Sequence, residues 1–240
     1  MLLRLPTSVS EAQACMAEGA EPIGGATLVW ATWQRDGFPE QAMSLRHLPE
    51  ANVIGSGTLG SAVLLNQVDD RVPEALRRAA GSVGTGAVRR TATVGGNLVG
   101  STLRCLLPAA LVLDAHATVL APERVYETDL AEVLAKHHLL LSLHWRTPVA
   151  TGYHKESGDA GGTPPLVVAA AVHAEDDGQR RLRVAVRDGY EVLCESVACE
   201  GGAAQALHAL ERTDIGALHS TARERVREQV TDVLAGVSGR

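Results

Sequence analysis

The most informative stretch of the chain is Ala87-Val88-Arg89-Arg90-Thr91-Ala92-Thr93-Val94-Gly95-Gly96-Asn97-Leu98. Two basic residues are followed by a short run rich in threonine and valine, and then by two adjacent glycines. Because glycine has no Cβ atom, such a pair lets the backbone turn tightly or lie directly against another group. We therefore expect this stretch to form a contact surface made of backbone.

A second glycine pair lies upstream, in Ile23-Gly24-Gly25-Ala26-Thr27-Leu28. A capping box at Ser8 and Glu11 predicts a helix over 9–18, followed by a strand over 21–23 and a helix over 28–33. Glycine-rich turns that lead into helices bind anions where their backbone N–H groups converge. Neither pair has the G-x-G-x-x-G spacing or a following lysine, so the Rossmann and P-loop motifs are not supported.

The remaining pattern predicts a chain of mixed helices and strands without internal repeats. A breaker-rich segment, Glu156 to Pro165, is expected to be a flexible loop at or just inside a domain boundary. The expected strands are 41–45, 52–54, 117–120, 139–145, 166–173, 181–187 and 192–198, and the further expected helices are 59–66, 73–80, 108–114, 203–211 and 221–235.

Composition excludes several classes of function. The chain has 240 residues, a formal charge of −6 and only 3% aromatic residues, which disfavours nucleic acid as a partner. Its four cysteines form no C-x-x-C pair and its histidines no H-E-x-x-H motif, so no metal site is expected. Neither a signal peptide nor a membrane span is recognisable, and we expect a cytoplasmic protein with reduced thiols.

Taken together, the two glycine stretches and Leu106-Leu107-Pro108-Ala109-Ala110-Leu111 resemble the FAD-binding domain of molybdenum hydroxylases. That family includes the medium subunit of carbon monoxide dehydrogenases and the flavin domain of xanthine dehydrogenases. The resemblance covers nearly the whole chain. It departs from the family at Thr102 and Cys105, where the family has proline and aspartate, and at Ala26-Thr27, where the family has threonine and aspartate.

The resemblance implies an α+β fold: a two-lobed FAD-binding domain of the molybdenum-hydroxylase flavoprotein (PCMH) type, followed by a smaller C-terminal antiparallel sheet with helices. We expect the FAD-binding domain over 1–147, with subdomains of about 1–50 and 51–147. The C-terminal α+β domain is expected over 148–240.

The resemblance also assigns cofactor-binding residues. The backbone of Ile23 to Leu28 is expected to wrap the FAD diphosphate, and Thr93 to Asn97 to approach the ribityl chain and the isoalloxazine, whose approach a Cβ at Gly95 or Gly96 would block. The complete set of expected cofactor-binding residues is Ile23, Gly24, Gly25, Ala26, Thr27, Leu28, Thr93, Val94, Gly95, Gly96, Asn97, Leu98, Ser101, Leu141 and Lys155. No catalytic side chain and no metal ligand is expected.

The function implied is that of an FAD-dependent oxidoreductase component. It would pass electrons between a molybdopterin-containing large subunit with a [2Fe–2S] small subunit and an acceptor such as NAD, oxygen or a quinone. Two alternatives remain open at the level of sequence. One is a stand-alone FAD-dependent oxidoreductase in a biosynthetic pathway, and the other is a degenerate homologue that serves as a scaffold without flavin.

Overall fold

Two units make up the chain in the computed structural model, which describes residues 1–158 and 162–238. The first unit comprises Met1–Val72, Val83–Arg104 and Ala115–Trp145. The second comprises Pro73–Ser82, Cys105–Asp114 and the residues from Arg146 onward. The domains expected over 1–147 and 148–240 stay a prediction. Residues 159–161 of the segment expected to be flexible lie outside the described residues.

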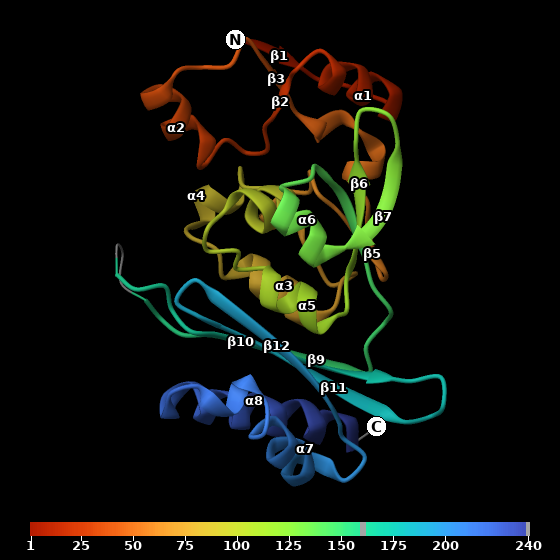
Figure 1. Ribbon diagram of the computed structural model, residues 1–240, viewed down its shortest axis with the longest axis vertical. Coiled ribbons are helices and arrows are strands. Elements are labelled where there is room, and N and C mark those ends of the chain that lie inside the picture. Colours follow the sequence, from red (N-terminus) through yellow and green to blue (C-terminus); the bar gives the residue numbers. More distant parts are fainter. Residues whose placement is uncertain (159–161, 239–240) are drawn as a thin grey trace. The chain divides into compact units, whose positions relative to one another are not determined.

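The first unit begins with a small parallel sheet of order β1-β3-β2, drawn in red to orange in Figure 1. Its strands are β1 (Leu2–Arg4), β2 (Glu21–Pro22) and β3 (Gln41–Met43), and its helices are α1 (Val9–Ala17) and α2 (Val29–Asp36). The hydroxyl of Ser8 accepts a hydrogen bond from the Glu11 amide at 3.3 Å, which confirms the predicted helix cap.

The first unit continues with a five-stranded antiparallel sheet of order β4-β5-β8-β6-β7. The strands are β4 (Ile54–Gly55), β5 (Thr58–Gly60), β6 (His116–Leu120), β7 (Val125–Asp129) and β8 (Leu140–His144). The helical segments are α4 (Gly86–Arg89), α6 (Leu130–Lys136), a π-helical turn at Gly96–Gly100 and 3₁₀ turns at Leu45–His47, Pro49–Ala51 and Leu65–Gln67. One apolar cluster includes Ala12 and Cys15 of α1, Met43 of β3 and Leu120 of β6, and so joins the two sheets of this unit.

The helix expected over 59–66 is wrong. Thr58 to Gly60 form β5, which pairs with β8, and only Leu65–Gln67 is helical. A Cβ atom at Gly60 would lie 2.2 Å from the carbonyl oxygen of Ala51, so this residue is held in a close backbone contact. Pairing between distant strands overrides the local helical spacing of Leu59, Val63 and Leu64.

The second unit is built on a four-stranded antiparallel sheet of order β12-β11-β10-β9. Its strands are β9 (Ala150–Lys155), β10 (Val167–Ala174), β11 (Arg180–Asp188) and β12 (Glu191–Ala198). Its helices are α3 (Glu74–Gly81), α5 (Leu107–Val112), α7 (Gly202–Leu210) and α8 (Ser220–Ser238), with a 3₁₀ turn at Asp214–Ala217. These elements confirm the predicted α+β class.

The sheet of the second unit is covered on both faces. Helices α7 and α8 cover one face (Figure 1), where alternate residues of β10, namely Val168, Ala170 and Val172, join their core. The side chain of His173, on the opposite side of the pleat, contacts the Val112 carbonyl of α5 at 2.7 Å. Among residues 1–158 and 162–238, no helix combines the length and the apolar character that crossing a membrane requires.

Tyr153 is a buried polar side chain within the second unit, where β9 meets the end of α3. Its hydroxyl lies 3.1 Å from Ser82 Oγ. Ser82 Oγ also donates to the Ala79 carbonyl at 2.8 Å, and the Tyr153 hydroxyl donates to the Cys105 carbonyl at 3.5 Å. Burial disfavours the phenolate and raises the pKa of Tyr153 to about 12.

We predict that Tyr153→Phe changes the alkaline stability of the protein. Because the pKa of Tyr153 is higher in the folded chain, its contribution is fully present below about pH 10 and is lost as the pH rises toward 12. Between pH 8 and 11 the wild type should lose about 1 kcal/mol more unfolding free energy than the variant in urea titrations. Tyr190→Phe is the control, since Tyr190 is 66% exposed. Equal losses in wild type and Tyr153→Phe would contradict the assignment.

Candidate functional site

The first glycine loop, residues 23–28, connects β2 to α2. The Ile23 amide donates to the Met43 carbonyl at 2.8 Å, which fixes the start of the loop on β3. The backbone N–H groups of residues 24–28 form no hydrogen bond within the described part of the chain. Ala26 has a φ of 56°, a left-handed conformation that an alanine adopts only at a cost in energy. The loop therefore presents consecutive unused donors ahead of a helix.

The second glycine loop, residues 93–97, is bound differently. The amides of Val94 and Gly95 donate to the carbonyls of Val63 and Ser61, at 3.0 and 2.8 Å. The Gly96 amide donates to the hydroxyl of Thr93 at 3.1 Å, at the entrance to the π-helical turn. Because these amides are already used, this loop offers bare backbone surface rather than hydrogen-bond donors.

The two glycine loops pack directly against one another. A Cβ atom at Gly25 would lie 1.7 Å from the carbonyl oxygen of Thr91, and one at Gly24 would lie 2.5 Å from Thr93 Oγ1. Distances this short are not found between real atoms, so both positions require glycine in this arrangement. Similarly, a Cβ at Gly95 would lie 2.9 Å from Ser61 Cβ. These glycines are therefore required for packing within the protein itself.

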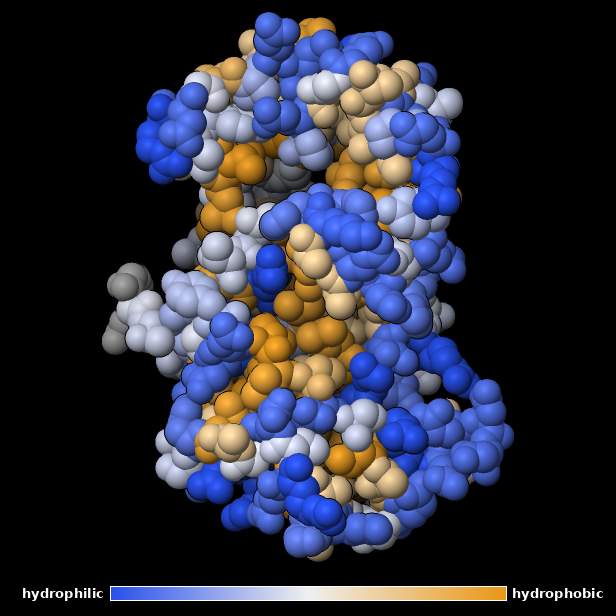
Figure 2. Space-filling view, viewed as in Figure 1, coloured by the Kyte–Doolittle hydropathy of each residue, from blue (hydrophilic) through white to orange (hydrophobic). Residues whose placement is uncertain are grey.

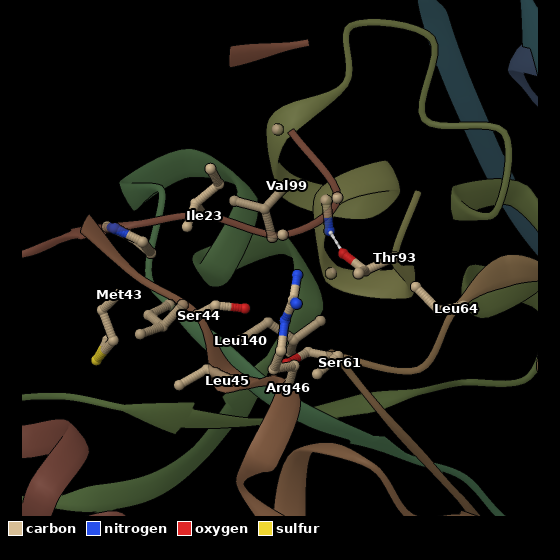
Figure 3. Close-up of a pocket in the computed structure, with 18 of the residues that line it drawn as sticks. Ile23, Met43, Ser44, Leu45, Arg46, Ser61, Leu64, Thr93, Val99 and Leu140 are labelled. Atoms are coloured by element: carbon tan, nitrogen blue, oxygen red, sulfur yellow. Dashed lines mark hydrogen bonds between the residues drawn. The ribbon is translucent and has the colours of Figure 1, made fainter. Parts of the chain in front are cut away.

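A cavity of about 620 Å³ opens beside this contact, within the first unit. This volume lies in the range of small-molecule and cofactor sites. Figure 2 shows the molecule hollowed between the N-terminal strands and the region of α4 and α6. Figure 3 shows side chains reaching it from several segments of the first unit, among them Ile23, Ser44, Arg46, Thr93 and Leu140.

The structure brings together part of the expected cofactor-binding set. The members that line the cavity are Ile23, Gly24, Gly25, Thr93, Gly95 and Gly96. Ala26, Thr27 and Leu28 continue the first loop beyond the lining. The side chains of Val94, Asn97 and Leu98 are buried in the first unit, as is that of Leu141, whose neighbours Leu139 and Leu140 line the cavity.

Two expected residues lie elsewhere. Ser101 follows the π-helical turn and does not line the cavity; its hydroxyl accepts a hydrogen bond from the Leu103 amide at 3.2 Å. Lys155 belongs to β9 of the second unit, where its Nζ donates to the Ser82 carbonyl at 2.7 Å. The cofactor-binding set as a whole stays a prediction.

Sequence patterns did not point to the polar residues on the other walls of the cavity. Ser44 and Arg46 follow β3, Ser61 follows β5, and His137 and His138 end α6. The short segment Ser44-Leu45-Arg46-His47 has no motif spacing that would mark it. His137 is the C-cap of α6 and has a left-handed backbone conformation with a φ of 52°.

The charged side chains that line the cavity among the described residues are cationic. Arg46, Arg90, His137 and His138 line it, and no aspartate or glutamate of the described residues does. This balance contrasts with the net charge of −6 of the whole chain. Arg89, next to Arg90, is used structurally, because its guanidinium donates to the carbonyls of Val83 and Gly84 at 2.9 Å each.

Metal chemistry finds no support among residues 1–158 and 162–238. They contain no group of His, Cys, Asp or Glu side chains that could hold a metal ion, and all four cysteines are free. Unused amides, cationic side chains and bare glycine surface instead fit a cofactor that carries a diphosphate and a large planar or sugar portion.

Comparisons with known proteins agree with this fit. A family described as the FAD binding domain in molybdopterin dehydrogenase matches residues 3–140. No curated protein matches the sequence. Among solved structures, quinoline 2-oxidoreductase from Pseudomonas putida 86 is similar with a TM-score of 0.73 and 17% identity, over 100% of this chain and 97% of that chain.

Two carbon monoxide dehydrogenases are also similar in fold. The reconstituted enzyme from Oligotropha carboxidovorans matches with a TM-score of 0.72 and 16% identity, over 100% of this chain and 98% of that chain. The enzyme from Hydrogenophaga pseudoflava that lacks the Mo-pyranopterin moiety matches with a TM-score of 0.71 and 15% identity, over 100% and 97%. These matches confirm the predicted fold.

We predict that Gly25→Ala separates the two glycine loops. The added Cβ meets backbone atoms of Thr91 and Ala92, which no rotation of a side chain can move away. The variant should lose about 3 kcal/mol or more of unfolding free energy, measured in urea. Gly100→Ala is the matched control, because Gly100 also lines the cavity and its Cβ would meet nothing within 4 Å. Equal stability of the two variants would contradict the loop contact.

Proposed function

The chain belongs to the family of FAD-binding domains of molybdopterin dehydrogenases, and on that premise we propose that it is the flavin-carrying subunit of a molybdenum hydroxylase-type oxidoreductase. In this role it passes electrons from partner subunits to an acceptor: NAD, oxygen or a quinone. The main support is a row of amides at residues 24–28 that form no hydrogen bond within the described residues, next to a cavity that no described aspartate or glutamate lines.

FAD, when bound, supplies both two-electron and one-electron chemistry. The chain's own residues bind and orient it. The amides of the first glycine loop would donate to the diphosphate, and the positive end of α2, which begins at Val29, would favour the same charge. The bare backbone of Gly95 and Gly96 lets a large cofactor lie close to the second loop.

Apolar side chains complete the cavity. Ile23, Val99, Leu139 and Leu140 line it and exclude water from the part of the cofactor that they cover. None of the described residues that line it is aromatic apart from the histidines His137 and His138. We propose that a planar ring within this cavity packs on aliphatic groups and on glycine backbone.

The partners follow from the family. Its name refers to a molybdopterin dehydrogenase, and similar chains come from carbon monoxide dehydrogenases and from quinoline 2-oxidoreductase. We propose a molybdopterin-containing large subunit and a [2Fe–2S] small subunit as partners. This chain's cysteines lack the spacing of an iron–sulfur site, so such a cluster belongs to another chain.

The first test is a titration of flavin-free protein with FAD, followed by the loss of FAD fluorescence and by the visible absorbance of the protein fraction. Saturable uptake is expected in the wild type and in the control Gly81→Ala, whose Cβ meets nothing within 4 Å and which does not line the cavity, and weaker or no uptake in Gly25→Ala. A wild-type protein that takes up no FAD would refute the flavin-binding role and favour the scaffold interpretation.

The second test is purification of the tagged chain from its native cells, with metal analysis of the product. Molybdenum and iron should be present together with the flavin, and should remain through a second column. A yellow protein that reproducibly carries neither metal would refute the subunit role and favour the stand-alone oxidoreductase.

A further inference from the structure

Arg46 is a cation without a partner in the described part of the chain. It lies in the 3₁₀ turn after β3 and lines the cavity. Its guanidinium forms no hydrogen bond or ion pair within residues 1–158 and 162–238, whereas its carbonyl accepts one from Asn52 Nδ2 at 3.2 Å. Figure 3 shows its side chain extending into the open space of the cavity. An arginine held by its backbone with a free guanidinium is available to a ligand.

Two serine residues line the same cavity as this arginine. Ser44 is 4% exposed and Ser61 is 5% exposed, and both line the cavity. Neither hydroxyl hydrogen-bonds to another described residue. In Figure 3 the oxygen of Ser44 points into the cavity. A serine hydroxyl that faces a cavity and has no hydrogen-bond partner among the described residues can donate to a polar ligand.

Arg90 adds a second free cation from a different segment. It caps the end of α4 and lines the same cavity, and its side chain forms no ion pair among the described residues. Arg46 and Arg90 come from parts of the chain that are separated by the whole of β4 and β5. Together with the absence of carboxylates from the described lining, they make the cavity complementary to a group of negative charge.

We propose that Arg46, supported by Ser44, binds the diphosphate of FAD and makes the site selective for a dinucleotide over riboflavin. This inference rests on the proposed flavin-binding function and adds a specificity-determining side chain to the backbone donors of residues 24–28. An arginine suits this role because its planar fork of N–H groups donates two parallel hydrogen bonds to phosphate oxygens. The Ser44 hydroxyl donates a third.

The test compares three ligands on wild type, Arg46→Gln and Arg46→Lys: FAD and riboflavin by fluorescence, and ADP by calorimetry. For Arg46→Gln we expect FAD and ADP to bind about tenfold to a hundredfold more weakly, since a charge-assisted pair is lost, while riboflavin binds as before. Arg46→Lys should fall between, because it keeps the charge and loses the fork. Ser44→Ala should weaken FAD and ADP by a smaller factor and leave riboflavin unchanged.

The control is Arg77→Gln, which removes the same charge from an exposed residue that does not line the cavity. It should leave all three affinities unchanged, and thermal unfolding should show that every variant is folded. The inference is overturned if Arg46→Gln binds ADP and FAD like wild type, or if riboflavin weakens as much as FAD does. Failure of the proposed function looks different, because wild type itself then takes up neither flavin.

Discussion

The carbonyl oxygen of Thr91 occupies the place where a Cβ atom of Gly25 would be, and the site in the first unit depends on this close approach. This contact joins the loop between β2 and α2 to residues 91–95, whose backbone is hydrogen-bonded to Ser61, Val63 and Leu65. The two segments are far apart in the sequence. With any larger residue at Gly25 they could not meet, and the cavity between them would lose a wall.

The two glycine loops contribute different groups to the site. The amides of the second loop donate hydrogen bonds to Val63, Ser61 and Thr93, which hold this loop in place. The second loop therefore presents backbone surface to the cavity. The first loop is held to β3 by the Ile23 amide, and its next amides, those of residues 24–28, form no hydrogen bond within the described residues. A chain that buries so many donors in other pairings but leaves a consecutive set open beside a cationic cavity is arranged for an anion. FAD, the cofactor of the family, carries such an anion at its centre.

The sequence predicted the elements that have strong local signals. The cap at Ser8, the strands β10 to β12 and the helices α7 and α8 all have clear periodicity or turn residues, and the structure confirms them. The prediction of a helix over 59–66 was wrong. Apolar residues at helical spacing begin there in the strand β5, whose partner β8 lies far along the chain. The short strand β7 and helix α6 had no signal that was recognised.

In the candidate site, too, some residues could be recognised from the sequence and others could not. Two glycine pairs are visible in the sequence because glycine itself is the signal, and Gly24, Gly25, Gly95 and Gly96 all line the cavity. Ser44 and Arg46 are common residue types in an unremarkable segment, and only the fold places them beside those glycines. In the proposed function, the amides of residues 24–28 donate to the diphosphate of FAD. The most direct measurement is the ¹H–¹⁵N NMR spectrum of the labelled protein with FAD, ADP or riboflavin. The account predicts that the amide signals of residues 24–28 shift on addition of FAD and of ADP and stay in place with riboflavin; signals that stay in place with FAD would contradict it.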